Sequence, residues 1–485
     1  MRKFPFFKKI YPGGKHIQRG YLMLLSLVFG AIIFMVLGSL SSFVLTQNHV
    51  QNASTGKTKG LSLAEAGLEY YRWFLAHNPG DLTNGTGSAG PYVLSYDDPE
   101  GGTAGSISLD VIGNSSCGVI TSIDINSTGT PADGTGVSKT LHARYAQPTV
   151  AQYSYVLNSS VWAGADRIIN GPYHSNGGIR MDGTANAPVT SSLASWLCTN
   201  SFGCSPSSNK NGVWGAGPNS NLWSYPTPQV DFAAIASDFT SLKTSAQTIG
   251  KYYPRYSSGS TYDTQNYHKG YHLIFNADGT VTVRRVSRTT VLSGVKPIDG
   301  SASTINDYNK INTEAFYQTY TINPDCGLIF VEDNVWVEGT IVGKVTLVAA
   351  NVVNVGIAPD VILKNNITYA NANSGLIIFA ENNMLIAPDS PNVMNLNGIF
   401  VAQGGAFGRN LYDCPSAYEP RTSLTIHGTT VSNLRTGTRW VNGCGGSDAG
   451  YQTRIDAYDR ALSTNPPPFT PVITTDYQFV DWREN

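Results

Sequence analysis

The residues best placed for chemistry are three carboxylates in two similar apolar segments. Glu332 and Asp333 lie in "VEDNV" (331–335), and Glu381 lies in "FAENN" (379–383). Paired carboxylates can act as general acid and base on polysaccharides. The three would converge if the segments stack in register. We expect them instead to face solvent at corners, and we predict a protein with no catalytic residues, so not an enzyme.

Other candidate motifs lack the context that their chemistry needs. "GTGSAG" (85–90) lies in a polar loop after a helix, not between a strand and a helix, so it does not predict a dinucleotide site. His174 and His272 fall in strand-like segments and are expected to be structural. We predict no cofactor and no metal site.

The six cysteines predict local disulfides. We pair Cys198 with Cys204 and Cys414 with Cys444 because they are close in sequence, although fifteen connectivities are possible. Cys117 and Cys326 are then left over, and we expect them to be buried as small apolar residues.

The segments that must position these residues are strand-like. "GLIFVEDNVWVEG" (327–339) is echoed by "GLIIFAENNMLIAP" (375–388), each with two apolar strands around a polar corner. Units that cannot bury their faces alone suggest a stacked β-solenoid over 151–430, with a β-sandwich as the alternative. An insertion over about 192–320 holds a helix beginning at Asp231 and a hairpin turning at Asp278–Gly279. Residues 431–485 are expected to form a cap.

The N-terminal part reads differently. Residues 1–20 are a basic leader, and 21–45 are apolar enough to span a bilayer of about 30 Å. The basic leader predicts a cytoplasmic N-terminus, a single membrane crossing and an exported bulk. Leu61, Ala64, Leu68, Tyr71 and Leu75 share one helix face, so 21–78 reads as a membrane helix and stalk, which Gly56 and Gly60 interrupt. Strand-like segments then predict a small β domain over 79–150. No basic face indicates nucleic-acid binding.

"QRGYLMLLS" (18–26) resembles the processing site of type IV prepilins, and "AEAGLEY" (64–70) resembles PilX-type minor pilins. The resemblance implies cleavage between Gly20 and Tyr21 by a prepilin peptidase. Major pilins carry Glu at the fifth mature position, where this chain has Leu25, which disfavours a role in the pilus shaft. The fold class is thus mainly β with an N-terminal helix, a pilin-like sheet and the solenoid.

The function that this resemblance implies is that of a non-enzymatic, membrane-anchored minor pilin-like protein of the cell surface or pilus tip. It would serve pilus assembly, adhesion or surface recognition, with other pilins as partners and a surface glycan or host molecule as a possible ligand. The alternative is an anchored carbohydrate-binding protein or polysaccharide-active enzyme unconnected with pili.

Overall fold

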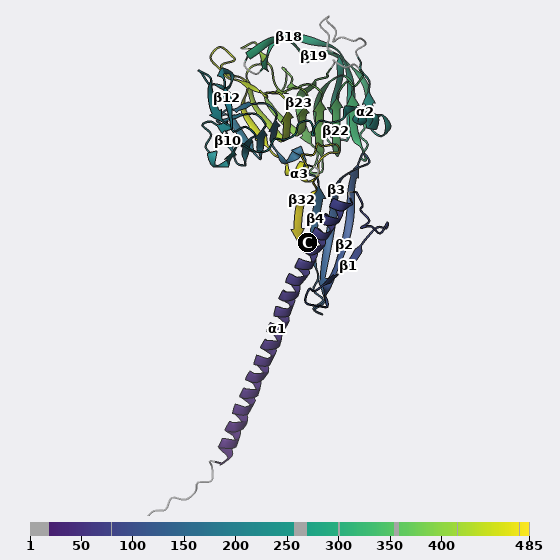
Figure 1. Ribbon diagram of the computed structural model, residues 1–485, viewed down its shortest axis with the longest axis vertical. Coiled ribbons are helices and arrows are strands. Elements are labelled where there is room, and N and C mark those ends of the chain that lie inside the picture. The colour runs from purple at the N-terminus through teal and green to yellow at the C-terminus, as the bar shows by residue number, and fades with distance from the viewer. Residues whose placement is uncertain are drawn as a thin grey trace, which may run out of the picture.

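The computed structural model describes residues 19–78, 80–256, 269–298, 301–353, 358–414, 416–474 and 476–484. A long helix leads to a small antiparallel sheet, and beyond the sheet lies a large head built mainly of strands (Figure 1). The chain is therefore mainly β with an extended N-terminal helix, as the sequence predicts.

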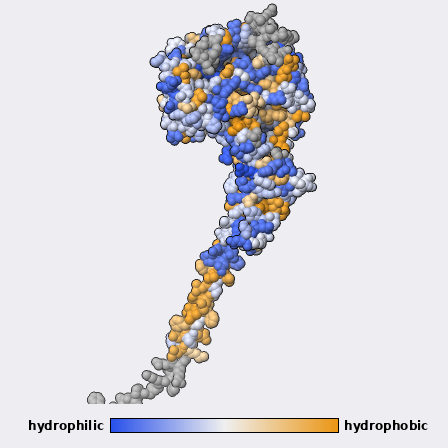
Figure 2. Space-filling model, viewed as in Figure 1, coloured by the Kyte–Doolittle hydropathy of each residue, from blue (hydrophilic) through white to orange (hydrophobic). Residues whose placement is uncertain are grey.

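Helix α1 (Arg19–His77) is continuous over 59 residues. Its N-terminal half is exposed and apolar, and its C-terminal half packs against the small sheet (Figure 2). Ala64, Leu68, Tyr71 and Leu75 of the predicted stripe are buried there.

The prediction that Gly56 and Gly60 interrupt this helix is wrong. They lie where α1 approaches the small sheet: a Cβ on Gly129 would lie 2.2 Å from the Gly60 carbonyl oxygen and 2.6 Å from the Ala64 amide nitrogen. The missing side chains permit this close packing, which outweighs the low helix propensity of glycine.

The small sheet has the strand order β1-β2-β3-β4-β32 and is antiparallel. Its strands are β1 (Tyr92–Asp97), β2 (Thr103–Ser116), β3 (Val119–Pro131), β4 (Lys139–Ala146) and β32 (Gln478–Glu484). The first four of these strands lie within residues 79–150.

The fifth strand, β32, corrects the prediction of a C-terminal cap over 431–485. It pairs with β4, placing Trp482 opposite Ala143, while earlier residues of the same segment form a central strand of the head. A free strand edge offers unpaired backbone groups to a distant segment, which local sequence does not reveal.

The head stacks parallel strands in rows from one turn of the chain to the next. The longest row, in spatial order, contains β16 (Lys251–Tyr253), β20 (Gly327–Val331), β22 (Lys344–Ala349), β24 (Gly375–Ala380), β26 (Val393–Ala402), β29 (Arg421–Ser432), β5 (Tyr155–Leu157), β8 (Tyr173–Ser175), β11 (Val189–Ser191) and β15 (Trp223–Ser224).

Further parallel rows complete the turns. One contains β17 (Gly270–Phe275), β21 (Asn334–Ile341), β23 (Val361–Tyr369), β25 (Met384–Ile386) and β27 (Phe407–Gly408). Another continues from β21, β23, β26 and β29 to β31 (Ala449–Ala457), β7 (Arg167–Asn170) and β10 (Thr184–Ala185). A short row contains β6 (Val161–Ala163), β9 (Ile179–Met181) and β14 (Val213–Trp214).

The chain enters this stack in the middle. It runs from β5 to one end at β15, crosses to the opposite end at β16, and works back to β29, which pairs with β5. Entry and exit therefore lie together: the Val150 amide donates to the Pro471 carbonyl at 3.0 Å, and the Ile473 amide donates to the Pro148 carbonyl at 2.9 Å. The chain segment that enters the head and the segment that leaves it therefore both connect directly to the small sheet.

Two hairpins project from the stack. One pairs β12 (Ser195–Cys198) with β13 (Ser208–Asn211), and the other pairs the long β18 (Thr280–Ile298) with β19 (Ser301–Thr321). The tip-side part of β18 also pairs with β28 (Leu411–Tyr412), so the long hairpin arches over the stack (Figure 1). Strand β30 (Arg439–Trp440) pairs with β31. Part of the predicted insertion (192–320) thus belongs to the stack itself, because β15, β16 and β17 pair in its parallel rows.

Short helices complete the head. α2 (Phe239–Thr248) begins later than predicted, because its N-cap is Asp238, whose side chain accepts hydrogen bonds from the backbone amides of Thr240 and Ser241. The predicted cap, Asp231, accepts hydrogen bonds only within the preceding turn. The predicted Asp278–Gly279 turn does join β17 to β18. The remaining short helices are α3 (Arg460–Thr464) and the 3-10 turns η1 (Val150–Gln152), η2 (Asn200–Phe202) and η3 (Ser220–Leu222).

Candidate functional site

The predicted processing residues lie at the first turn of α1. The helix begins at Arg19, and Tyr21 is exposed. The helix contains a stretch long and apolar enough to cross a membrane, and that stretch buries nothing against the rest of the protein. An exposed apolar surface of this length in water would be strongly unfavourable, so it marks a contact with lipid or with another apolar helix.

The three corner carboxylates do not face solvent freely, which corrects that expectation. Glu332 is buried and accepts hydrogen bonds from the Lys243 ammonium at 2.5 Å and the Tyr252 hydroxyl at 2.6 Å. Asp333 is also buried. Glu381 accepts a hydrogen bond from the backbone amide of Asn351 at 2.7 Å. Burial raises the pKa of Glu381.

Asp333 accepts a hydrogen bond from the backbone amide of Tyr256 at 3.0 Å, so each carboxylate is engaged with different partners. Buried charges need such partners to offset lost hydration. The interactions tie Glu332 to side chains of α2 and β16, and Glu381 to the backbone that follows β22.

His174 and His272 both lie buried between hydrogen-bonding partners. The Nδ1 of His174 lies 2.8 Å from the Thr190 hydroxyl and its Nε2 lies 3.0 Å from the Asn176 amide oxygen, and burial lowers its pKa. His272 lies between Glu314 (2.8 Å) and Glu338 (3.0 Å). Burial alone would lower the pKa of His272, but these two carboxylates outweigh it and raise the pKa.

The structure joins all six cysteines as disulfides. Cys198 pairs with Cys204 and Cys414 with Cys444. The expectation that Cys117 and Cys326 stay as small apolar residues is wrong, since they form a third disulfide between the β2–β3 turn and the segment before β20. A separation of 209 residues hides this pair from any argument by sequence proximity.

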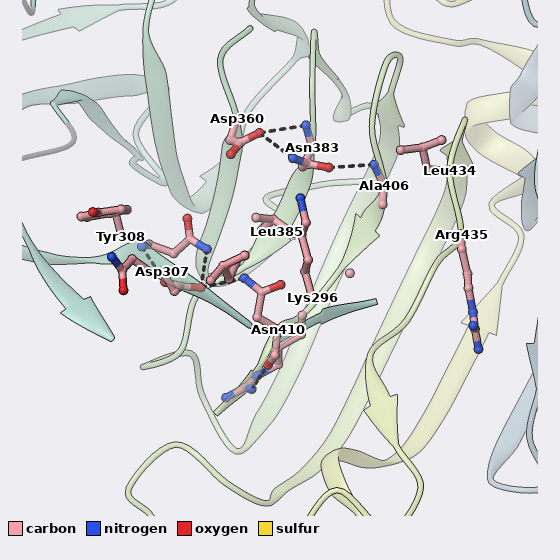
Figure 3. Close-up of a pocket in the computed structure, with 15 residues that line it drawn as sticks. Lys296, Asp307, Tyr308, Asp360, Asn383, Leu385, Ala406, Asn410, Leu434 and Arg435 are labelled. Atoms are coloured by element: carbon pink, nitrogen blue, oxygen red, sulfur yellow. Dashed lines mark hydrogen bonds between the residues drawn. The ribbon is translucent and has the colours of Figure 1, made fainter. Parts of the chain in front are cut away.

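A cavity of about 460 Å³ lies between the long hairpin and the parallel stack (Figure 3). The hairpin supplies one wall, the ends and corners of stack strands supply the other, and the loop after β29 closes one side. The lining residues are Lys296, Ile305, Asn306, Asp307, Tyr308, Asn309, Asp360, Asn383, Leu385, Ala406, Gly408, Arg409, Asn410, Leu434 and Arg435.

Asp307 organises the hairpin wall of this cavity. Its carboxylate accepts a hydrogen bond from the backbone amide of Asn309 at 2.8 Å and another from the side-chain amide of Asn410 at 2.7 Å. The Tyr412 hydroxyl donates to the same carboxylate at 2.8 Å, and the Trp336 indole donates to the Asn309 carbonyl at 2.7 Å. Saturated buried networks of this kind make a wall rigid.

Asp360 and Asn383 form a ladder on the stack wall. One Asp360 oxygen accepts both the backbone amide of Asn383 at 2.9 Å and its side-chain amide at 3.1 Å. The Asn383 side-chain oxygen in turn accepts the Ala406 amide at 3.0 Å, one turn further along (Figure 3). Burial raises the pKa of Asp360 to about 6.

Sequence reasoning missed this cavity. "IAPD" (357–360) and "NDYN" (306–309) lie far apart in sequence, and neither matches a known catalytic spacing. The only local signal is the Asn and Asp content of the corners. Among the described residues, no cluster of His, Cys, Asp and Glu could hold a metal ion.

Comparison with known proteins gives likenesses to solved structures alone. No protein-family profile matches the chain, and no curated protein matches it. Among solved structures, the competence-associated pilin ComZ from Thermus thermophilus is 13% identical, with 89% of this chain and 98% of that chain covered and a TM-score of 0.32. At that TM-score the two chains are not shown to share a fold.

Proposed function

We propose that this chain is a membrane-anchored, surface-exposed minor pilin-like protein for type IV pilus assembly, adhesion or surface recognition. The observation that carries the proposal is the two-part character of α1: exposed and apolar in its N-terminal half, and packed by its C-terminal half on a small antiparallel sheet. A single helix that is both anchor and stalk lets a subunit leave the bilayer and join other subunits through the same surface.

The proposed topology is a single crossing with the N-terminus in the cytoplasm. The basic leader supports this orientation. The three disulfides support an oxidising compartment for everything after the anchor.

A position at the pilus tip follows from size and from Leu25. The head is far wider than the stalk and would crowd neighbours in a helical shaft (Figure 1). An uncharged Leu25 lacks the carboxylate with which shaft subunits are expected to set their register. The proposed partners are other pilins and a prepilin peptidase. The head acts by binding, without catalysis, which the separate engagement of Glu332, Asp333 and Glu381 supports.

The mature N-terminus of the native protein tests the proposal. Mass spectrometry in cells with the prepilin peptidase should show a chain beginning at Tyr21, and in cells without it a chain beginning at Met1. Gly20→Val should block processing, whereas Gly14→Val, inside the leader, should not. Deleting the gene should reduce piliation or surface attachment. An intact Met1 in cells that process other prepilins would favour the alternative of an anchored carbohydrate-binding protein.

A further inference from the structure

The cavity under the long hairpin has the size and lining of a binding pocket. Close-packed proteins retain few voids larger than a water molecule, whereas sites for small ligands measure roughly 300 to 1,000 Å³. A cavity of about 460 Å³ falls in that range. It is also braced: β18 is paired to β28 on the stack, and the Asp307 network fixes the opposite strand. The space is therefore built into the fold.

Each of the two walls carries both polar and apolar groups. Polar groups gather around Asp360, Asn383 and Lys296, whose side chain points toward Asn383 (Figure 3). Aliphatic side chains of Ile305 and Leu385 also line the space. A ligand that fits must carry several hydroxyl-like donors and acceptors and also an apolar surface.

We propose that this cavity binds a saccharide ring at the end of a glycan. Sugar hydroxyls would pair with the carboxyl of Asp360 and the amide of Asn306, and the C–H face of the ring would pack on Leu385 and Ile305. The ammonium of Lys296 would donate a hydrogen bond either to a ring hydroxyl or to the carboxylate of an acidic sugar. The proposal goes beyond pilin-like anchoring, since the cavity lies wholly in the head.

The hydrogen-bonding capacity that some cavity residues still have supports this assignment. Asp307 is already saturated by Asn309, Asn410 and Tyr412, so it shapes the wall. Both hydrogen bonds from Asn383 fall on one carboxylate oxygen of Asp360 and the side chain of Asn382 is a further donor, which leaves part of the four-site acceptor capacity of the carboxylate unused, and Lys296 is exposed at the cavity. A rigid wall with a few open polar groups lowers the cost of ordering on binding.

The test is calorimetric titration of the full-length protein in detergent with three defined tetrasaccharides: cellotetraose, chitotetraose and tetragalacturonate. At least one should bind. Leu385→Trp should weaken binding by more than about tenfold, because the indole would occupy the volume that the sugar ring needs and the rigid walls leave no other place for the ring. Asp360→Asn keeps an acceptor for Asn383 but removes the carboxylate, and should weaken binding by about tenfold.

Lys296→Gln separates the two kinds of sugar. This variant should weaken the binding of tetragalacturonate by more than about tenfold and the binding of the neutral sugars by less, because a charge-assisted hydrogen bond is roughly twice as strong as a neutral one. Matched controls are Lys59→Gln on α1 and Val393→Trp, an exposed residue of β26, both of which should bind as the wild type does.

Unchanged thermal unfolding shows that each variant is folded. No binding of any of the three sugars, or binding that folded Leu385→Trp and Asp360→Asn both leave intact, would overturn the proposal. Either result leaves the N-terminal processing test untouched, so the two proposals fail separately. Cleavage of a bound sugar would support the pocket and overturn the non-enzymatic part of the proposed function.

Discussion

Cys117 and Cys326 join the small sheet to the head by a disulfide that spans 209 residues, with their Cα atoms 4.5 Å apart. The Cys117 amide also donates to the Asp325 carbonyl at 2.9 Å. The paired segments around Val150 and Pro471 also tie the head to the sheet. The disulfide is thus a further covalent link between the part that holds the anchor and the part that carries the cavity.

Replacing both cysteines of this link by serine should destabilise the protein by about 2 to 5 kcal/mol, because the disulfide closes a long loop in the unfolded chain. Thermal unfolding and protease cleavage at the sheet–head junction would measure the change. The matched control is the double serine variant of Cys198 and Cys204, which closes a separation of only 6 residues and should cost less. Equal losses in both variants would argue against this role.

Gly129 should tolerate no side chain. In Gly129→Ala the new Cβ would meet the Gly60 carbonyl oxygen at 2.2 Å, so α1 must shift away from the sheet. Overpacking of this kind costs about 1 to 3 kcal/mol. Denaturant unfolding followed by tryptophan fluorescence gives the loss. Gly38→Ala, where nothing lies within 4 Å of the new Cβ, should be neutral or slightly stabilising.

His272 should make stability depend on pH. Its pKa is raised, so its contribution is complete below the ordinary histidine value of about 6.5 and is lost as pH rises through the higher folded value. Burial alone would raise the pKa of Glu314, but His272, Arg284 and Lys364 together outweigh it and lower that pKa, and the hydrogen bond to His272 is the leading cause that lowers the pKa of Glu338. Their contribution is therefore lost as pH falls through the acidic range.

The cluster should stabilise the head most in mildly acidic solution. Arg284, which lies 2.7 Å from Glu314, and Lys364, which lowers the pKa of both glutamates, are the cations facing it. Unfolding temperature measured from pH 5 to pH 9 should fall across the alkaline side, and His272→Gln should flatten that slope. An identical slope in the variant would show that other groups cause it.

Arg167 and Asp456 should be mutually dependent. They form a buried ion pair between β7 and β31, where the early strands meet the late strands of the stack, and the Arg167 guanidinium also lies 4.2 Å from the centre of the Tyr155 ring. Asp456→Ala would leave a buried cation unpaired, at a cost of about 3 to 5 kcal/mol. Glu69→Ala, which breaks an exposed pair with Arg72, should cost less than about 1 kcal/mol. Unfolding free energies of the two variants would differ accordingly.

Several features of this chain follow from sequence alone because they depend on neighbouring residues. The apolar run from Tyr21, the buried helix face through Leu68 and Tyr71, and the turn at Asp278–Gly279 each reflect a local period or a local backbone preference. The four consecutive strands of the small sheet follow for the same reason.

Tertiary structure decided the rest, because an alternating or apolar pattern states that a face is buried without stating what covers it. Only the fold shows that β29 stacks on β5, that β32 completes the small sheet, and that Cys117 meets Cys326. Only the fold brings Lys296 of the hairpin to Asp360 of the stack across one cavity. These contacts join segments separated by long stretches of chain, where the summed burial and pairing of the whole molecule choose the partner.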